Sequence, residues 1–155
     1  MKNRVLALKR MILVITLLCT IVFFTSCTAR KMKDYYSQKD NYITATGTIS
    51  HIAYSDGKDI LYYGFSNVIY PSNMNYHFEY YNFKVVGENF QILHEQNIDE
   101  KVNMGDEVTF IAAPEYFYDG YAIPIVSISV NGECLLEFEE GYANLLEWLK
   151  TTPIY

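Results

Sequence analysis

The stretch Tyr42–Tyr54 constrains the fold most, because its residues alternate strictly between two chemical types. Ile43, Gly47 and Ile49 fall on one side, whereas threonine and serine fill the other. An alternation of period two with β-branched residues predicts a strand that has one buried face. Gly47 predicts a bulge or sharp bend, which would let one long strand serve two sides of a barrel. The same alternation places His51 on the face of Ile49, as a hydrogen-bonded histidine at the rim.

The rest of the chain repeats this strand pattern and adds two helices. The expected further strands are Ile60–Phe65, Tyr76–Val86, Val108–Ala112, Tyr121–Val130 and Glu133–Phe138. Asn131-Gly132 is a strong hairpin signal that pairs the last two, and Pro124 would keep the start of its strand at an edge or rim. A short linking helix is expected over Glu88–Glu95. Leucines at helical spacing predict an amphipathic C-terminal helix over Glu139–Lys150.

The order of these elements is similar to that of a known fold. Three strands, a short helical link and two strands that begin at Gly105-Asp106-Glu107-Val108 resemble the oligonucleotide/oligosaccharide-binding (OB) fold over roughly Asn41–Val130. The resemblance implies a five-stranded barrel that binds ligands on the face of its second and third strands, and it transfers no functional residue. A small curved antiparallel sheet with helices on one face fits the same pattern. We therefore expect one mainly β domain, over residues 40–155, of either kind.

The first 26 residues have the layout of a secretory signal peptide. A basic segment precedes Met11–Phe24, which carries no charge. As a helix this apolar run would reach about 21 Å at roughly 1.5 Å per residue, well short of a hydrocarbon core of about 30 Å. The sequence therefore predicts an apolar helix that is removed with the signal peptide, residues 1–26. An uncleaved N-terminal transmembrane anchor is the alternative.

The apolar run ends at Phe24-Thr25-Ser26-Cys27, which resembles the lipobox of bacterial lipoproteins. The resemblance implies that Cys27 receives a diacylglycerol thioether and begins the mature chain. Residues 27–39 would then be a lipidated tether, whose basic residues Arg30, Lys31 and Lys33 lie near anionic headgroups. The domain would be anchored to the extracytoplasmic face of the bacterial cell membrane. Cys134 would be the remaining thiol, which we expect to be buried and inert.

Charge and aromatic content narrow the range of expected binding partners. Four of the 12 basic residues and none of the 18 acidic residues precede Cys27, which leaves the exported part with a formal charge of −10. Nucleic acid is thus excluded as an expected partner, because stacked bases require basic residues between the aromatic ones. All 15 tyrosines follow Cys27, and tyrosine is abundant in recognition surfaces. The candidate ligand-binding residues are Tyr62, Tyr80, Tyr116, Phe117, Tyr118 and Tyr121.

Sequence motifs for catalysis or metal binding are not found. The three histidines are scattered without metal-ligand spacing, and no nucleophile elbow or phosphate-binding glycine loop occurs. We expect no cofactor, no metal and no catalytic residue, and favour a non-enzymatic envelope module that binds a glycan or a protein. The alternatives are an envelope hydrolase with dispersed acids such as Glu115 and Asp119, and a structural subunit of an envelope complex. The tyrosines could equally be filler of core and rim.

Overall fold

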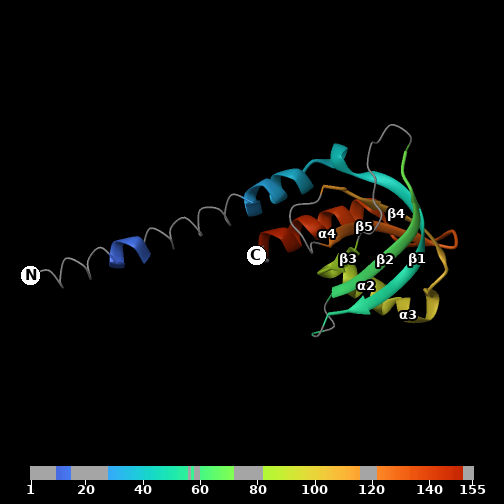
Figure 1. Cartoon of the computed structure of the whole chain (residues 1–155). Coiled ribbons are helices and arrows are strands. Elements are labelled where there is room, and N and C mark those ends of the chain that lie inside the picture. Colours follow the sequence, from blue (N-terminus) through green and yellow to red (C-terminus); the bar gives the residue numbers. More distant parts are fainter. Residues whose placement is uncertain are drawn as a thin grey trace, which may run out of the picture.

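The computed structural model describes residues 10–14, 28–55, 57, 60–71, 82–115 and 122–151. Within these residues the domain is mainly β, and six strands form one sheet (Figure 1). The strands are β1 (Ile43–Tyr54), β2 (Ile60–Ile69), β3 (Asn82–Val86), β4 (Glu107–Ala112), β5 (Ile123–Val130) and β6 (Glu133–Leu136). The helical elements with named bounds are η1 (Lys39–Asn41), α2 (Glu88–Glu95), α3 (Ile98–Lys101) and α4 (Phe138–Thr151). Residues 28–36 form a further helix.

The sheet curls into a ring because β3 and β5, the first and fifth strands in spatial order, also pair. The order is β3-β2-β1-β4-β5-β6, with antiparallel neighbours. A short parallel contact, Phe83 opposite Ile123, joins β3 to β5. The result is ring-like, although it is not a regular barrel. The expectation of a mainly β domain, a curved antiparallel sheet or OB-like barrel with a linking helix and a C-terminal helix, is confirmed.

β1 is the long strand that the alternation predicts. Its pairing with β4 runs through Gly47 without a shift. In its pairing with β2, the step from Thr46 to Thr48 faces a longer step from Ile69 to Ser66. The extra residue therefore lies in β2, where Asn67 has a positive φ of 52°, and the bulge predicted at Gly47 is not present. A second shift follows between Ile49 and His51. Because a bulge inserts one residue into the pleat, His51 is turned out to solvent and is exposed. Its predicted place on the face of Ile49 is therefore wrong.

The ring is filled by side chains from the inner faces of its strands. Three phenylalanines from three strands form its aromatic centre: Phe65 and Phe83 lie 4.9 Å apart between ring centroids, and Phe110 lies 4.6 Å and 4.7 Å from them. All three are buried. Their offset and tilted arrangements are those that aromatic pairs favour. The inner face of each strand thus builds one continuous core.

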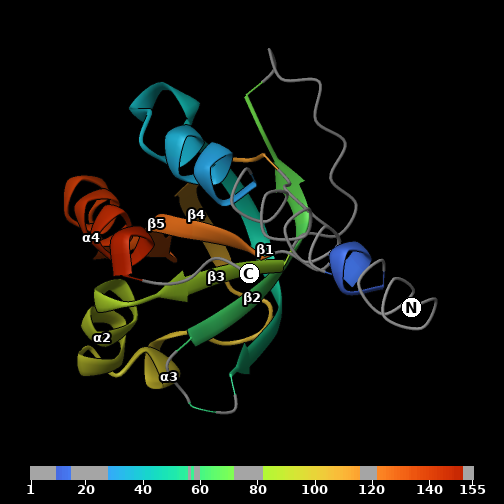
Figure 2. The ribbon, with the colours of Figure 1, turned by 90° about the vertical axis from the view of Figure 1, so that its left-hand side faces the viewer.

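A second core lies outside the ring, under two helices. Residues 28–36 and α4 lie side by side on the outer surface (Figures 1 and 2). Met32 is 1% exposed and Tyr36 0% exposed, and both pack in a cluster with Val126 of β5 and Leu145 of α4. The sequence predicted a tether over residues 27–39. Within that range residues 28–36 form a helix with a buried face, because Met32 and Tyr36, at i and i+4, share a side of the helix.

Several element boundaries differ from those expected. β2 continues past Phe65 to Ile69, because it carries a bulge after Ser66 and pairs again with β1 at Thr46. α3 was not predicted, since its four residues carry no helical repeat. Residues 76–81 of the expected third strand lie outside the described residues. The helices α2 and α4 lie where the sequence placed them.

Two single-residue predictions at the end of the sheet are wrong. Pro124 does not lie at a free edge: it is buried, and it is paired with Lys84 at the seam that closes the ring. That contact involves two residue pairs, so the missing proline N–H costs little. Cys134 is exposed, because β6 is the outer strand of the sheet and this residue points away from the core. The Asn131-Gly132 hairpin is confirmed, with both φ angles positive at 49° and 86°.

Candidate functional site

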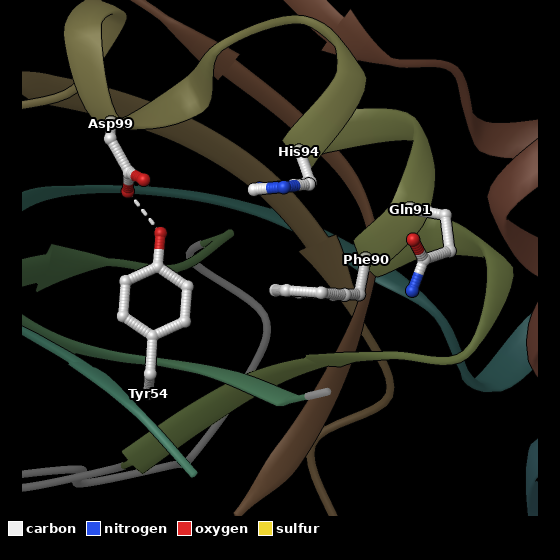
Figure 3. Close-up of a pocket in the computed structure, with 5 residues that line it drawn as sticks. All are labelled: Tyr54, Phe90, Gln91, His94 and Asp99. Carbon is white, nitrogen blue, oxygen red and sulfur yellow. Dashed lines mark hydrogen bonds between the residues drawn. The ribbon is translucent and has the colours of Figure 1, made fainter. Parts of the chain in front are cut away.

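A pocket opens where the end of β1 meets α2 and α3 (Figure 3). Its volume is about 290 Å³, which is at the small end of the range for ligand sites. Three elements distant in sequence supply its wall. The lining residues are Tyr54, Phe90, Gln91, His94 and Asp99.

The aromatic part of the pocket is held by helix geometry. Phe90 and His94 are four residues apart on α2, so their rings share one side of the helix and stack with centroids 5.8 Å apart and planes at 10°. Tyr54 meets Phe90 edge to face, at 6.2 Å and 81°. Phe90 is 3% exposed and belongs to the ring core, whereas His94 is exposed. The core therefore fixes the floor of the pocket, and the imidazole lies at its mouth.

The polar part of the pocket centres on a tyrosine and a carboxylate. The Tyr54 hydroxyl donates a hydrogen bond to Asp99 Oδ1 (Figure 3). Asp99 is placed by Asn97, whose left-handed backbone (φ 56°) turns the chain from α2 into α3. Burial, and then the bonded Asp99 carboxylate, raise the pKa of Tyr54 to about 12. At neutral pH the hydroxyl is protonated, and Asp99 keeps lone pairs for a further donor.

These groups together offer the contacts of a small binding site. The partly exposed ring of Tyr54 and the exposed ring of His94 offer apolar contact, whereas Phe90 lies in the core beneath them. Asp99 accepts hydrogen bonds, Gln91 donates and accepts, and His94 does either according to its protonation state. A tyrosine with a raised pKa is a poor base or nucleophile at neutral pH. The arrangement suits the recognition of a ring that carries several polar substituents.

The tyrosine-rich face predicted from the sequence is only partly within the described residues. Tyr62 lies on β2 between the buried Leu61 and Tyr63, so it points to the outer side of the ring and is partly buried. It is paired with Lys84 of β3 and does not line the pocket. The other candidates, Tyr80, Tyr116, Phe117, Tyr118 and Tyr121, lie outside the described residues, as does the lipidation candidate Cys27.

Three other tyrosines pack in the hydrophobic cores. Tyr63 is buried inside the ring, and Tyr36 and Tyr142 are buried under the outer helices. The alternative interpretation of the tyrosine content is thus correct for these three residues.

Sequence reasoning missed the pocket because its residues come from separate segments. The available signal was the i, i+4 pair Phe90 and His94 in a helix that was itself predicted. Asp99 stands beside Glu100, and two adjacent acids by themselves indicate only a solvated face. Nothing in the sequence indicates that the end of β1 carries Tyr54 to within hydrogen-bonding range of Asp99, because that contact depends on the pairing of β1 with β2 and of β2 with β3.

Within the described ranges, no cluster of three or more His, Cys, Asp or Glu side chains is arranged to hold a metal ion. Among the same residues, no helix is long and apolar enough to cross a bilayer. Comparisons with protein-family models, with curated proteins and with solved structures found no match to the chain.

Proposed function

We propose that this chain is an exported, membrane-tethered module that binds one ring of an envelope glycan in the pocket of Tyr54, Phe90, Gln91, His94 and Asp99. The observation that carries the proposal is the pocket itself, in which aromatic faces and three kinds of polar group surround about 290 Å³. Ligand sites usually combine apolar walls with a few placed polar groups. A pocket of this size favours one ring over an extended chain.

The ligand is best matched by a sugar that carries a cationic amine. Asp99 is the acidic group that lines the pocket, and the Tyr54 hydroxyl already donates to it. Aromatic faces also attract cations. Because Asp99 is exposed, its ion pair with an amine is screened by water and contributes about 0.2–1 kcal/mol. An amino sugar therefore gains more from this pocket than a neutral sugar does.

Support for export and tethering comes from the N-terminal residues. The signal layout of residues 1–26 is followed by the lipobox-like Cys27. The helix of residues 28–36 begins at the next residue. Because that helix packs on the domain, a lipid on Cys27 would hold the domain close to the membrane. Figure 1 shows residues 28–36 and α3 at opposite ends of the domain. In this arrangement the pocket beside α3 faces away from the bilayer.

The enzymatic alternative has one observation in its favour, since Asp99 and His94 line the same pocket. Glycoside hydrolysis ordinarily uses a pair of carboxylates, and the five lining residues include one. Of the acids considered from the sequence, Glu115 is exposed with its backbone N–H donating to the Tyr35 hydroxyl oxygen. Asp119 lies outside the described residues. Binding therefore accounts for the geometry better than hydrolysis.

The test is a titration of the purified full chain, in detergent micelles, with a panel of neutral, amino and acidic sugars. Saturation-transfer NMR measures the binding of each sugar. We expect the amino sugars to bind most tightly. Asp99→Asn should weaken that binding about two- to fivefold, the factor that corresponds to losing an exposed ion pair worth about 0.5–1 kcal/mol. His94→Ala should weaken it less, because His94 lies at the mouth.

The matched controls are Glu100→Gln and His51→Ala. Both positions are exposed and neither lines the pocket, so both variants should bind like the unmodified chain. Binding of no sugar, or equal losses in the Asp99→Asn and Glu100→Gln variants, would refute the proposal. Turnover of a bound glycoside would instead establish the enzymatic alternative.

A further inference from the structure

A second groove lies between the helix of residues 28–36 and α4, on the outer side of the ring. Its volume is about 270 Å³, and its lining is mostly apolar with charged groups at the border. Leu146 and Leu149 of α4 form the apolar part. Lys33 and Asp34 of the 28–36 helix and Ser37 of the turn after it border the groove on one side, and Lys150 of α4 borders it on the other.

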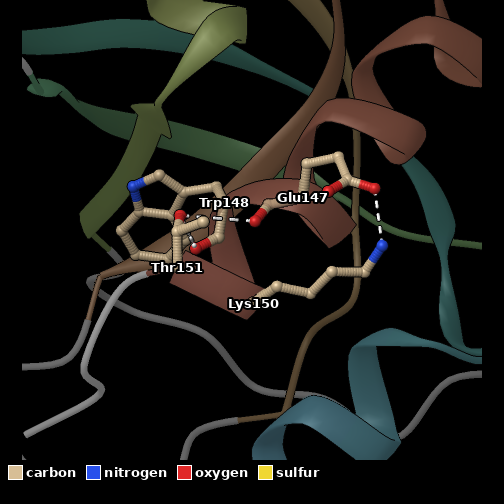
Figure 4. A network of polar contacts seen from close by, with 4 residues as sticks. All are labelled: Glu147, Trp148, Lys150 and Thr151. Atoms are coloured by element: carbon tan, nitrogen blue, oxygen red, sulfur yellow. Dashed lines mark hydrogen bonds and ion pairs between the residues drawn. The ribbon is translucent and has the colours of Figure 1, made fainter.

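The two lysines reach the groove from ordered helices. Lys33 follows Met32, and the burial of Met32 fixes the side of the helix on which Lys33 lies. Lys150 lies in the last turn of α4, where its ammonium is 2.5 Å from Glu147 Oε1 (Figure 4). The Thr151 hydroxyl donates to the Trp148 and Glu147 carbonyl oxygens at 3.2 Å and 3.4 Å, so it caps that last turn. Trp148 points to the opposite side of the helix (Figure 4).

The groove lies at the end of the molecule where the chain arrives from Cys27. Figures 1 and 2 both show the start of the 28–36 helix and the end of α4 on the same side. Lys33 is six residues after Cys27, which is about 9 Å along a helix axis. A lipid on Cys27 would therefore hold the groove at the depth of the headgroups.

The charge of this end contrasts with that of the rest of the domain. The exported part has a formal charge of −10, yet residues 28–36 contain three basic residues and one acid, Asp34. Lys150 adds a fourth cation beside them, although Glu147 partly offsets it. A surface of this kind complements anionic lipid. The apolar floor beneath the lysines complements the first methylenes of an acyl chain.

We propose that this groove receives the headgroup of an anionic phospholipid, with Lys33 and Lys150 on its phosphate and Leu146 against its glycerol and upper acyl carbons. The domain then rests on the membrane through this face, with a fixed orientation. The inference rests on the membrane tethering in the proposed function and is independent of the sugar pocket.

The test uses the full chain in vesicles of phosphatidylcholine alone or of phosphatidylcholine with phosphatidylglycerol. Amine acetylation followed by mass spectrometry measures the reactivity of each lysine. In the anionic vesicles we expect Lys33 and Lys150 to react about fivefold more slowly, the factor that corresponds to about 1 kcal/mol per lysine at an anionic surface. Lys39 and Lys101, whose ion pairs with Glu139 and Glu133 lie elsewhere, should react equally in both.

A second measurement uses a phosphatidylglycerol with a photoactivatable headgroup. It should crosslink to the groove in the unmodified chain and in a Lys39→Gln/Lys101→Gln control, and the crosslink should be lost in Lys33→Gln/Lys150→Gln, which has the same net charge as the control. Equal losses in both double variants would overturn the proposal, as would equal lysine reactivity in the two vesicle types. A chain that does not float with any vesicle would contradict the tether itself, and the lipid site with it.

Discussion

Gly141 of α4 is the position where one added methyl group tests the packing of the domain most severely. The helix crosses β5 so closely that a Cβ on residue 141 would lie 2.8 Å from the carbonyl carbon of Val126, and closer still to its oxygen. It would also lie 3.2 Å from Leu136 Cδ2. Since the obstacle is backbone, no side-chain rotation relieves it. The helix must move away from the sheet in a Gly141→Ala variant.

The magnitude follows from two opposed effects. Alanine is favoured over glycine in a helix by about 1 kcal/mol. Overpacking in a core costs about 1–3 kcal/mol, and occasionally more. Here a shift of α4 also loosens the packing of Tyr142 and Leu145 in the outer core. Because the obstacle is backbone, we expect the clash to cost about 3 kcal/mol, the upper end of that range. Less the helix-propensity gain, the net loss in the free energy of unfolding is about 2 kcal/mol.

The assay is urea unfolding, in which a loss of this size lowers the midpoint by about 1 M. Ala143→Gly is the matched control, because residue 143 is exposed on the same helix and should lose only about 1 kcal/mol from helix propensity. A Gly141→Ala variant as stable as the unmodified chain, or more stable, would refute the close approach of α4 to β5.

Three further predictions concern buried polar groups. Asn89→Leu should cost about 1–3 kcal/mol, because the buried Asn89 side chain donates to the Gly141 carbonyl and accepts from Asn144. Asn144→Ala, which removes only the outer partner, should cost less in the same urea assay. Burial lowers the pKa of Lys84 to about 8, so the unfolded state binds more protons above that pH and stability should rise from about pH 8 to 10; Lys84→Met should abolish this rise, and an unchanged slope would contradict the burial. The pKa of Tyr54 is raised to about 12, so its stabilising contribution should be lost as pH rises from about 10 to 12. Urea midpoints of Tyr54→Phe across that range should fall less steeply than those of the unmodified chain.

Much of the fold could be predicted because local patterns specify it. The alternation along β1 predicted the strand, and Asn131-Gly132 predicted the last hairpin. The bulge expected at Gly47 lies instead in the paired strand β2. The assignment of residues to the faces of a strand failed where the register of pairing shifts. Each bulge exchanges the two faces of a strand, which is why His51 was assigned to the wrong side. The helix of residues 28–36 was missed because its short buried face, Met32 and Tyr36, has meaning only once α4 is packed beside it.

The candidate site could not be predicted, for a related reason. Tyr54, Phe90 and Asp99 belong to three elements that meet only when β1, β2 and β3 pair, and each residue has an ordinary local explanation. The abundance of tyrosine pointed toward recognition, yet Tyr36 and Tyr63 are buried in the two cores. Composition alone does not separate tyrosines that bind from those that pack.

The most direct test of the proposed glycan site is a chemical-shift map of the full chain titrated with the amino sugar that binds most tightly. The account predicts that the largest shifts occur at Tyr54, Gln91, His94 and Asp99, with saturation at a single site. Shifts centred on the outer face around Tyr62, or no shift in the α2 and α3 segment at saturating sugar, would contradict it.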